Sequence, residues 1–417
     1  MTHLLIYAPE LVGHPRVYCR VIADALRDDA CQIDLALGLD EKVNVGTSPD
    51  LQPLVGRPRV SLFPTRDASA TGSRFLRAEE LLGLQERRQT DCTLFIEADK
   101  SEIELRRIAT GAAPRLRGRN LGIFANTAEW YPGEDSFTGE PKAIRAKTLR
   151  TTLGNIKRLV LHRRRSARYF YEKVVLGKGV LDAIIVKDER LAAWFGPPVL
   201  WMPEISRPAT TPESDADREA HQSISLAYSK FLTDNAGKEP TLYFGDAAYY
   251  KGYDLFLEYL CREPEVCGVH AGQTYDAQQR GFFRCDVEQL RQELRAEGRL
   301  FETNAYVHTQ RLKELFFGSV PRYLTTHRLT LSSSTTLQAL ELGKPLLVPD
   351  RGLLGYRVRQ NGLGRTYRYG DLDDLMVQAR AFRAEAPTKY EAPIRAFSAQ
   401  FSDDAIARFF RQTLLRP

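Results

Sequence analysis

A run of small hydroxyl residues precedes a segment of helical apolar spacing near the C-terminal end of the chain. The run spans residues 332–336, and the apolar stripe that follows is Leu337, Leu340 and Leu342, before Gly343. This order predicts a capped helix start, a helix, and a stop at a glycine suited to the left-handed conformation. The first N–H groups of a helix lack intrahelical partners, so the run also predicts a docking place for an anion such as a diphosphate.

A lysine lies in a second loop, between a predicted strand at 241–245 and a predicted helix at 253–261. Lys251 precedes Gly252, and Asp246 opens the same loop. The ammonium group is either a ligand for a phosphate or a solvated loop lysine. Asp246 would either accept a hydrogen bond from a ligand hydroxyl or pair with Lys251 in the empty site.

Polar residues also follow predicted strands in the first half of the chain. Gly13 and His14 come after the first strand, and glycine there lets a backbone approach a ligand closely. Glu97, Asn126 and Glu129 lie at the ends of two later strands. Because ligands of parallel α/β sheets sit beyond the carboxyl ends of the strands, all five residues are candidates for a site. His14 is otherwise a structural residue.

Apolar runs typical of buried strands alternate with segments of helical spacing along the chain, which predicts a parallel α/β architecture. A polar stretch with prolines near both ends interrupts the alternation, which then restarts. We therefore predict an N-terminal α/β domain at 1–204, a linker with one helix at 205–240, a C-terminal α/β domain at 241–396 and a terminal helix at 397–417. Ligand sites favour clefts between such domains.

The bulk composition excludes several classes of protein. The chain is 43% hydrophobic and 27% charged, and no apolar run approaches the ~18 residues of a membrane span. Its first residues lack the features of a signal peptide. The six cysteines are scattered without a C-x-x-C pair, which argues for a cytoplasmic protein with reduced thiols and against disulfides and zinc. The glycine fingerprint of nicotinamide enzymes is absent.

A basic stretch at 157–175 interleaves lysines and arginines with Tyr169, Phe170 and Tyr171. Such a stretch can seat a protein at the inner face of an anionic membrane, at about 1 kcal/mol per cation. The alternative is a solvated helix face that packs its aromatic rings into the core. Nucleic acid would use the same residues, but the chain has no recognised nucleic-acid-binding module, so we expect no nucleic-acid partner.

Several of these segments together resemble the retaining GT-B glycosyltransferases of family 4. The strand, loop and helix at 242–260, with their Lys-Gly pair, are similar to an element of the family's donor-binding domain. The segment at 331–364 resembles its loop, helix, Gly-Lys-Pro turn, strand and Gly-rich loop. Segments 4–26 and 182–204 look like the first and last elements of its N-terminal domain.

The resemblance implies two Rossmann-like doubly wound domains that face each other across a cleft, with the C-terminal helix crossing back to the N-terminal domain. It implies transfer of a sugar from a nucleotide-sugar, bound by the C-terminal domain, to a glycan, glycolipid or lipid-linked acceptor, bound by the N-terminal domain. No metal and no other cofactor is needed in this family. The residues that would bind the donor are Gly13, Asp246, Lys251, Ser332, Ser333, Ser334, Thr335 and Gln338.

The reaction that the resemblance implies sets the requirements for catalysis. A departing nucleoside diphosphate develops negative charge, which N–H groups and cations must meet. A retaining enzyme needs no dedicated base, whereas an inverting one needs a carboxylate or histidine near the acceptor hydroxyl. His14 and Glu129 are the candidate catalytic residues, and Asn126 would lie on the acceptor side.

Four positions depart from the family pattern. Asp246 stands where the family has an arginine, Leu331 and Gln338 where it has two glutamates, and Tyr356 where it has another. Gln338 keeps the capacity to hydrogen-bond a ribose hydroxyl. The departures leave two alternatives open: a GT-B relative that serves as a scaffold or partner subunit, and an epimerase or phosphorylase on the same fold. The cations that would replace the missing arginine are Arg328, His327 and Arg351, each otherwise a surface residue.

Overall fold

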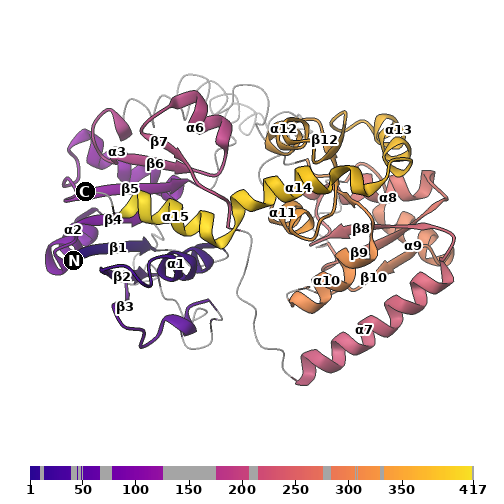
Figure 1. The fold of residues 1–417 in the computed structure, drawn as a ribbon, viewed down its shortest axis with the longest axis horizontal. Helices are drawn as coiled ribbons and strands as arrows, with labels where there is room; N and C mark the ends of the chain where they lie inside the picture. Colours follow the sequence, from indigo (N-terminus) through magenta and orange to yellow (C-terminus); the bar gives the residue numbers. More distant parts are fainter. Residues whose placement is uncertain are drawn as a thin grey trace, which may run out of the picture. The chain divides into compact units, whose positions relative to one another are not determined.

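The computed structural model describes residues 1–9, 14–38, 45, 48, 50–65, 78–124, 175–205, 215–275, 283–305, 307, 309–328 and 333–415. The chain divides into two compact units. Unit 1 comprises Met1–Ala209 and Phe401–Pro417, and unit 2 comprises Thr210–Gln400. Each unit contains parallel strands joined by helices, as the alternation of apolar runs and helical spacing predicts (Figure 1).

The described part of unit 1 is built on a seven-stranded parallel sheet with the order β3-β2-β1-β4-β5-β6-β7. The chain reverses its direction of winding between β1 and β4, which is the topological switch point of a doubly wound sheet. The strands are β1 (Thr2–Ala8), β2 (Cys31–Leu37), β3 (Val60–Pro64), β4 (Cys92–Phe95), β5 (Arg119–Phe124), β6 (Ala183–Val186) and β7 (Val199–Trp201).

Helices cover both faces of this sheet, as Figure 1 shows. Helix α1 (His14–Ala25) and helix α15 (Asp403–Leu414) pack together on one face. Helices α2 (Ala78–Arg88), α3 (Glu102–Thr110) and α6 (Glu189–Phe195) belong to the other layer. Because both faces are buried, the strands have the continuous apolar runs that distinguish parallel sheets from antiparallel ones.

The return of the C-terminal helix to unit 1 follows from its apolar spacing. Ile406, Phe410 and Leu414 lie on one side of α15 and are buried in the same core as the residues of α1. Ser402 caps the helix, because its hydroxyl accepts a hydrogen bond from the N–H of Ala405 at 3.3 Å. The predicted crossing of this helix back to the N-terminal domain is therefore confirmed.

Unit 2 contains two three-stranded parallel sheet segments, β10-β9-β8 and β11-β12-β13. Strand β8 lies beside β11, so the six strands follow the order 10-9-8-11-12-13 of a doubly wound domain. The strands are β8 (Glu239–Phe244), β9 (Val266–Ala271), β10 (Leu300–Glu302), β11 (Tyr323–Leu324), β12 (Leu346–Pro349) and β13 (Gly364–Tyr367).

The helices of unit 2 pack on these strands and on one another. They are α7 (Asp215–Asp234), α8 (Tyr253–Arg262), α9 (Val287–Ala296), α10 (Gln310–Ser319), α11 (Ser334–Glu341), α12 (Gly352–Asn361), α13 (Leu372–Arg383) and α14 (Glu391–Ser398). Tyr228 joins α7 to this unit: its ring lies 5.0 Å from those of Phe301 and Phe316, and its hydroxyl bonds to Ser319. None of the described helices has the length and apolar character needed to cross a membrane.

One local prediction was wrong. The segment expected to be a Gly-rich loop after β12 forms helix α12, because Leu353, Leu354 and Val358 lie at helical spacing and are buried. Gly355 permits that helix to lie close to the chain before it, since a Cβ there would be 2.4 Å from the carbonyl carbon of Asp350.

Candidate functional site

The loop after β8 places a lysine directly over a glycine. Gly245 has a φ of +109°, a backbone conformation that favours glycine. A Cβ added at Gly245 would lie 2.9 Å from Nζ of Lys251. The ammonium group therefore occupies the space that a side chain at Gly245 would fill, at the carboxyl end of β8.

The charge of Lys251 is incompletely compensated. Its side chain is only 20% exposed, and burial lowers its pKa. Asp246 opposes that shift in part, but its Oδ2 lies 3.9 Å from Nζ, beyond hydrogen-bond length, and its side chain is 47% exposed. The pairing of Asp246 with Lys251, one of two alternatives predicted from the sequence, is thus the one observed.

The lysine is held in place through the short 3-10 helix η6 (Tyr249–Lys251) and the chain that follows β11. The hydroxyl of Thr326 donates to the carbonyls of Lys251 and Gly252, at 3.1 Å and 2.8 Å. Gly252 has a φ of +69°, and a Cβ there would lie 1.9 Å from the carbonyl oxygen of Thr326. Only glycine allows the two loops to approach this closely.

Two residues expected to supply an additional cation, His327 and Arg328, are buried or paired in the structure. His327 is buried, and burial together with the charge of Lys251 lowers its pKa to about 3, so it is neutral near pH 7. Arg328 donates to both carboxylate oxygens of Asp254, at 2.7 Å and 2.8 Å, and its guanidinium lies 4.1 Å from the ring centroid of Tyr249. His327 and Arg328 are therefore not surface residues, and Arg328 also holds the loop before Lys251 through a hydrogen bond to the carbonyl of Tyr249.

Helix α11 begins beside these loops with an N-terminus that no serine side chain caps. Ser333 occupies the N-cap position, but its hydroxyl bonds to Oγ1 of Thr335 at 2.9 Å instead of to a backbone N–H. Tyr323 of β11 donates to the same Thr335 oxygen at 3.2 Å. The expected side-chain cap is therefore wrong, because hydroxyl-to-hydroxyl bonds take its place. The first N–H groups of the helix have no intrahelical partner and can meet an anion.

The structure brings together some of the predicted site residues. Lys251 and Asp246 are neighbours, and Ser333, Ser334 and Thr335 form the first turn of α11. Gln338 lies one turn further along that helix and is half-buried. His14 is the first residue of α1, after β1, and only its backbone is described. The candidates that lie outside the described residues are Gly13, Asn126, Glu129, Ser332 and nearly all of 157–175.

A buried polar network under the loop was not predicted. Nε2 of His270 lies 3.1 Å from the carbonyl oxygen of Gly245, and Nδ1 lies 3.5 Å from Oε1 of Glu302. Burial alone would raise the pKa of Glu302, but hydrogen bonds from His270 and Arg291 and the charges of Arg291 and Arg295 lower it to about 2. No sequence signal marks this network, since its members lie on separate strands and on α9.

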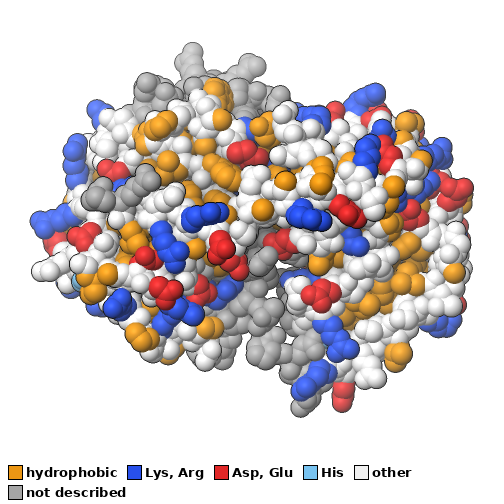
Figure 2. Space-filling view, in the orientation of Figure 1, with side chains coloured by type: hydrophobic (Ala, Val, Ile, Leu, Met, Phe, Trp, Pro, Cys, Tyr) orange, Lys and Arg blue, Asp and Glu red, His pale blue; other side chains and the backbone are white. Residues whose placement is uncertain are grey.

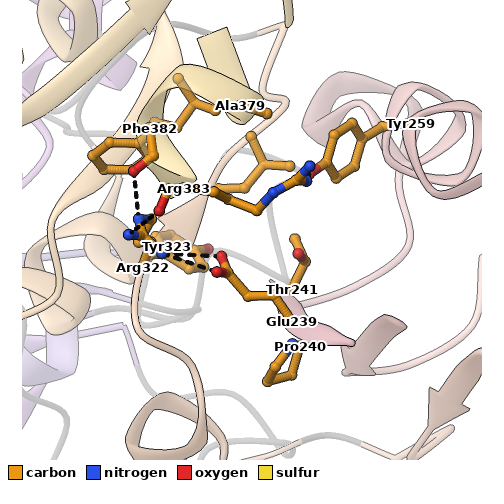
Figure 3. Close-up of a pocket in the computed structure, with 11 residues that line it drawn as sticks. Glu239, Pro240, Thr241, Tyr259, Arg322, Tyr323, Ala379, Phe382 and Arg383 are labelled. Atoms are coloured by element: carbon orange, nitrogen blue, oxygen red, sulfur yellow. Dashed lines mark hydrogen bonds and ion pairs between the residues drawn. The ribbon is translucent and has the colours of Figure 1, made fainter. Parts of the chain in front are cut away.

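The opposite edge of the unit 2 sheet has a shallow pocket that is closed by internal bonds (Figure 3). Arg322 points at Glu239 and makes two bonds to its carboxylate, at 3.1 Å and 3.0 Å, and it also donates to the carbonyl of Phe382 at 2.9 Å. Arg383 donates a hydrogen bond to the hydroxyl of Tyr259 at 3.2 Å. These groups bond to one another, which gives the pocket a structural role.

The described residues contain no cluster of histidine, cysteine and carboxylate side chains able to hold a metal ion. On the face in Figure 2, basic and acidic side chains alternate over the described surface. At the carboxyl ends of the unit 2 strands, Lys251 with its incompletely compensated charge and the N-terminus of α11 are two features that can bind an anion. Such a site can stabilise negative charge that develops on a phosphate.

Comparisons with known proteins reveal the fold. No protein-family profile matches the sequence, and none of the curated proteins compared with it matches either. Among solved structures, the chain is similar to a sucrose-phosphate synthase from Thermosynechococcus elongatus, with a TM-score of 0.60, 14% identity, and coverage of 99% of this chain and 98% of that chain. It is also similar to HepE from Anabaena in complex with UDP, with a TM-score of 0.58, 14% identity and 99% coverage of both chains.

A third similar structure is the lipopolysaccharide outer core galactosyltransferase WaaB, with a TM-score of 0.57, 11% identity, and coverage of 99% of this chain and 98% of that chain. These proteins are GT-B glycosyltransferases with two Rossmann-like domains. The chain therefore has the GT-B fold, and the predicted fold class is confirmed. The assignment to family 4 stays a prediction.

Proposed function

We propose that the chain is a glycosyltransferase that moves a sugar from a nucleotide-sugar donor to an acceptor hydroxyl. The observation that carries the proposal is the ammonium group of Lys251, held over Gly245 with an incompletely compensated charge. It lies on a GT-B fold, and one similar structure, HepE, was solved with UDP and with UDP-glucose. Crevices at the carboxyl ends of parallel strands are where ligands of such domains bind.

The diphosphate of the donor would lie against Lys251 and the N-terminus of α11. As the bond between the sugar and the diphosphate breaks, negative charge grows on the departing phosphate oxygen. The ammonium group and the helix N–H groups would meet that charge, and they would stabilise the transition state more than the ground state. We propose that these groups meet the charge without a metal ion, so that the transfer is metal-independent. Ser334, Thr335 and Gln338 would contact the donor beside them.

The finer features of the reaction are proposals of the same kind. We propose a glycan, glycolipid or lipid-linked acceptor, bound by unit 1 with Asn126 nearby, and His14 and Glu129 as the groups that face the acceptor hydroxyl. We propose retention of the anomeric configuration, which NMR of the first product formed would test. Activity that survives chelation by EDTA would support metal independence, and flotation with anionic vesicles would test membrane contact through 157–175.

Calorimetric titration with UDP-, GDP-, ADP-, CMP- and TDP-sugars tests the function directly. The folded chain should bind at least one of them, and Lys251→Met should weaken that binding. Lys344→Met is the matched control: burial lowers the pKa of Lys344 as well, but this lysine precedes β12 and lies at the amino end of the sheet. Absence of binding by every nucleotide to the folded protein would rule the function out.

One observation favours a second candidate, a GT-B relative that acts as a scaffold or partner subunit. Asp246 partly neutralises the lysine on which catalysis would depend. Transfer or hydrolysis of a donor that disappears in Lys251→Met would exclude this candidate. Binding of a nucleotide without any turnover, over a panel of acceptors, would favour it.

A further inference from the structure

The charges around Lys251 leave the loop region without net positive charge. Lys251 carries one positive charge, and Asp246 carries one negative charge 3.9 Å away. His327 is neutral near pH 7 because burial and the charge of Lys251 lower its pKa to about 3. Arg328 is bonded to both oxygens of Asp254, so the two charges cancel. A diphosphate that docks here therefore meets a carboxylate as well as an ammonium group.

The carboxylate cannot move far from the lysine, because the backbone of Asp246 is held in place. The hydroxyl of Tyr243 donates to the carbonyl of Asp246 at 3.2 Å. On either side, the N–H of Gly245 donates to the carbonyl of Ala271, and the N–H of Ala247 donates to the carbonyl of Gln273, both at 2.9 Å. With this backbone held, the distance between the two charges changes only through rotation of the Asp246 or Lys251 side chain.

We propose that Asp246 is a specificity-determining residue. Its carboxylate competes with the donor's phosphates for Lys251 and reduces the gain in affinity that a second phosphate would give. This inference rests on the proposed function, because it takes a nucleotide as the ligand of Lys251. A nucleoside monophosphate gives Lys251 one phosphate to bind. A nucleoside diphosphate adds further negative charge beside Asp246, and the repulsion offsets part of the added attraction. The protein as it stands discriminates little between the two classes of nucleotide.

The test compares nucleoside monophosphates with the corresponding diphosphates in the full-length protein and in Asp246→Asn. The dissociation constants of UMP and UDP, and of the GMP/GDP, AMP/ADP and CMP/CDP pairs, are measured by calorimetry at fixed ionic strength. Asp246→Asn should tighten diphosphate binding about fivefold. Charge interactions of a half-exposed carboxylate such as Asp246 contribute up to about 1 kcal/mol, which corresponds to that change in Kd. The dissociation constant of the monophosphate should change less. The ratio of the monophosphate constant to the diphosphate constant should therefore rise.

Asp234→Asn is the matched control. Asp234 also pairs with a lysine, Lys230, at 2.7 Å, and it lies on α7 of the same unit. The control makes the same change of net charge through an ion pair outside the site, so it should leave the ratio of dissociation constants unchanged. A ratio that rises equally in both variants would show a general charge effect and overturn the proposal.

The remaining outcomes separate this proposal from the proposed function. Unchanged nucleotide binding in Asp246→Asn overturns the specificity role alone, since the carboxylate would then have no effect on the nucleotide. Weaker binding also overturns that role alone, since the carboxylate would then be a ligand of the donor. Failure of every nucleotide to bind either the unaltered protein or Asp246→Asn overturns both proposals together. Tighter diphosphate binding with a higher diphosphate-to-monophosphate preference in Asp246→Asn supports both.

Discussion

Each unit has a lysine beyond the carboxyl end of a strand, and the two lysines differ in how the protein treats their charge. Lys187 directly follows β6 in unit 1, and Lys251 lies in the loop after β8 in unit 2. Nζ of Lys187 is 5.4 Å from the centroid of the Tyr18 ring. Burial alone would lower the pKa of Lys187, but attraction to Tyr18, Glu204 and Glu97 outweighs burial and raises it.

Lys251 shows the reverse balance. Burial lowers its pKa, and the attraction of Asp246 recovers only part of the loss. The difference lies in the partners: Tyr18 and two carboxylates, of which Glu204 is only 4% exposed, act on Lys187, whereas one half-exposed carboxylate acts on Lys251. A lysine whose charge is satisfied by the protein serves the fold, and a lysine left short of negative charge is poised for an anionic ligand.

The largest effect that we expect from replacing either lysine is a loss of stability in a Lys187 variant. Lys187→Met removes the cation that Glu204 and Glu97 attract and should destabilise unit 1 by about 3–5 kcal/mol, the cost of leaving a buried charge uncompensated. The raised pKa means that the stabilising effect of Lys187 is fully present below the pKa of an unfolded lysine, near 10.4, so the loss is complete at pH 7.

Tryptophan fluorescence during denaturant unfolding can isolate this effect. All three tryptophans, Trp130, Trp194 and Trp201, lie in the sequence of unit 1. The midpoint of their transition should fall in Lys187→Met and stay unchanged in the unit 2 variant Lys251→Met. An unchanged midpoint in Lys187→Met would show that the charge of this lysine is not needed by the fold, and the contrast between the two lysines would collapse.

The next largest effect is on binding. Lys251→Met should weaken nucleotide binding by about 2–3 kcal/mol, which is roughly 30- to 150-fold in Kd, because a charge-assisted bond to phosphate is lost. The free energy of unfolding should change by less than about 1 kcal/mol or rise slightly, because burial already disfavours the charged lysine in the folded state. Calorimetry and circular dichroism of the same samples would check both expectations. A large loss of stability would show that Lys251 is structural.

A smaller loss of binding is expected from a variant that moves the ammonium group of Lys251 but keeps its charge. Gly245→Ala should weaken nucleotide binding about tenfold, because the added Cβ would lie 2.9 Å from Nζ of Lys251 and displace it. Gly298→Ala is the control, since Gly298 also has a positive φ, of +66°, but a Cβ there would meet no atom within 4 Å. Both variants should lose about 1 kcal/mol of stability through backbone strain. Equal binding by the two variants would contradict the placement of Lys251.

The smallest expected effect is a shift in pH dependence. Nucleotide binding needs the protonated lysine, so Kd should increase as the pH rises through the lowered pKa of Lys251, before an ordinary lysine near 10.4 would titrate. In Asp246→Asn this rise should begin at still lower pH, because the carboxylate is what partly restores the pKa. The nucleotide phosphates are fully ionised well below this range. A shift to higher pH in the variant would contradict the assigned role of Asp246.

The sequence predicted much of the fold because its signals are local. Buried strands show as continuous apolar runs, and helix α15 shows as apolar residues at helical spacing after Ser402. The glycine that follows Lys251 and the hydroxyl run at the start of α11 marked both parts of the candidate site for the same reason. The exception is α12, whose glycines suggest a loop although its leucines are buried.

The sequence by itself thus determined the two α/β units, the return of the C-terminal helix and the presence of Lys251 beside Asp246 in one loop. Only the tertiary structure decided what charge that loop carries. Whether Arg328 is a spare cation depends on Asp254, a residue 74 positions away, and whether His327 is charged depends on its burial beside Lys251. Electrostatic attraction and desolvation act through space, so the partners that set a charge are fixed by packing and cannot be read from neighbouring residues.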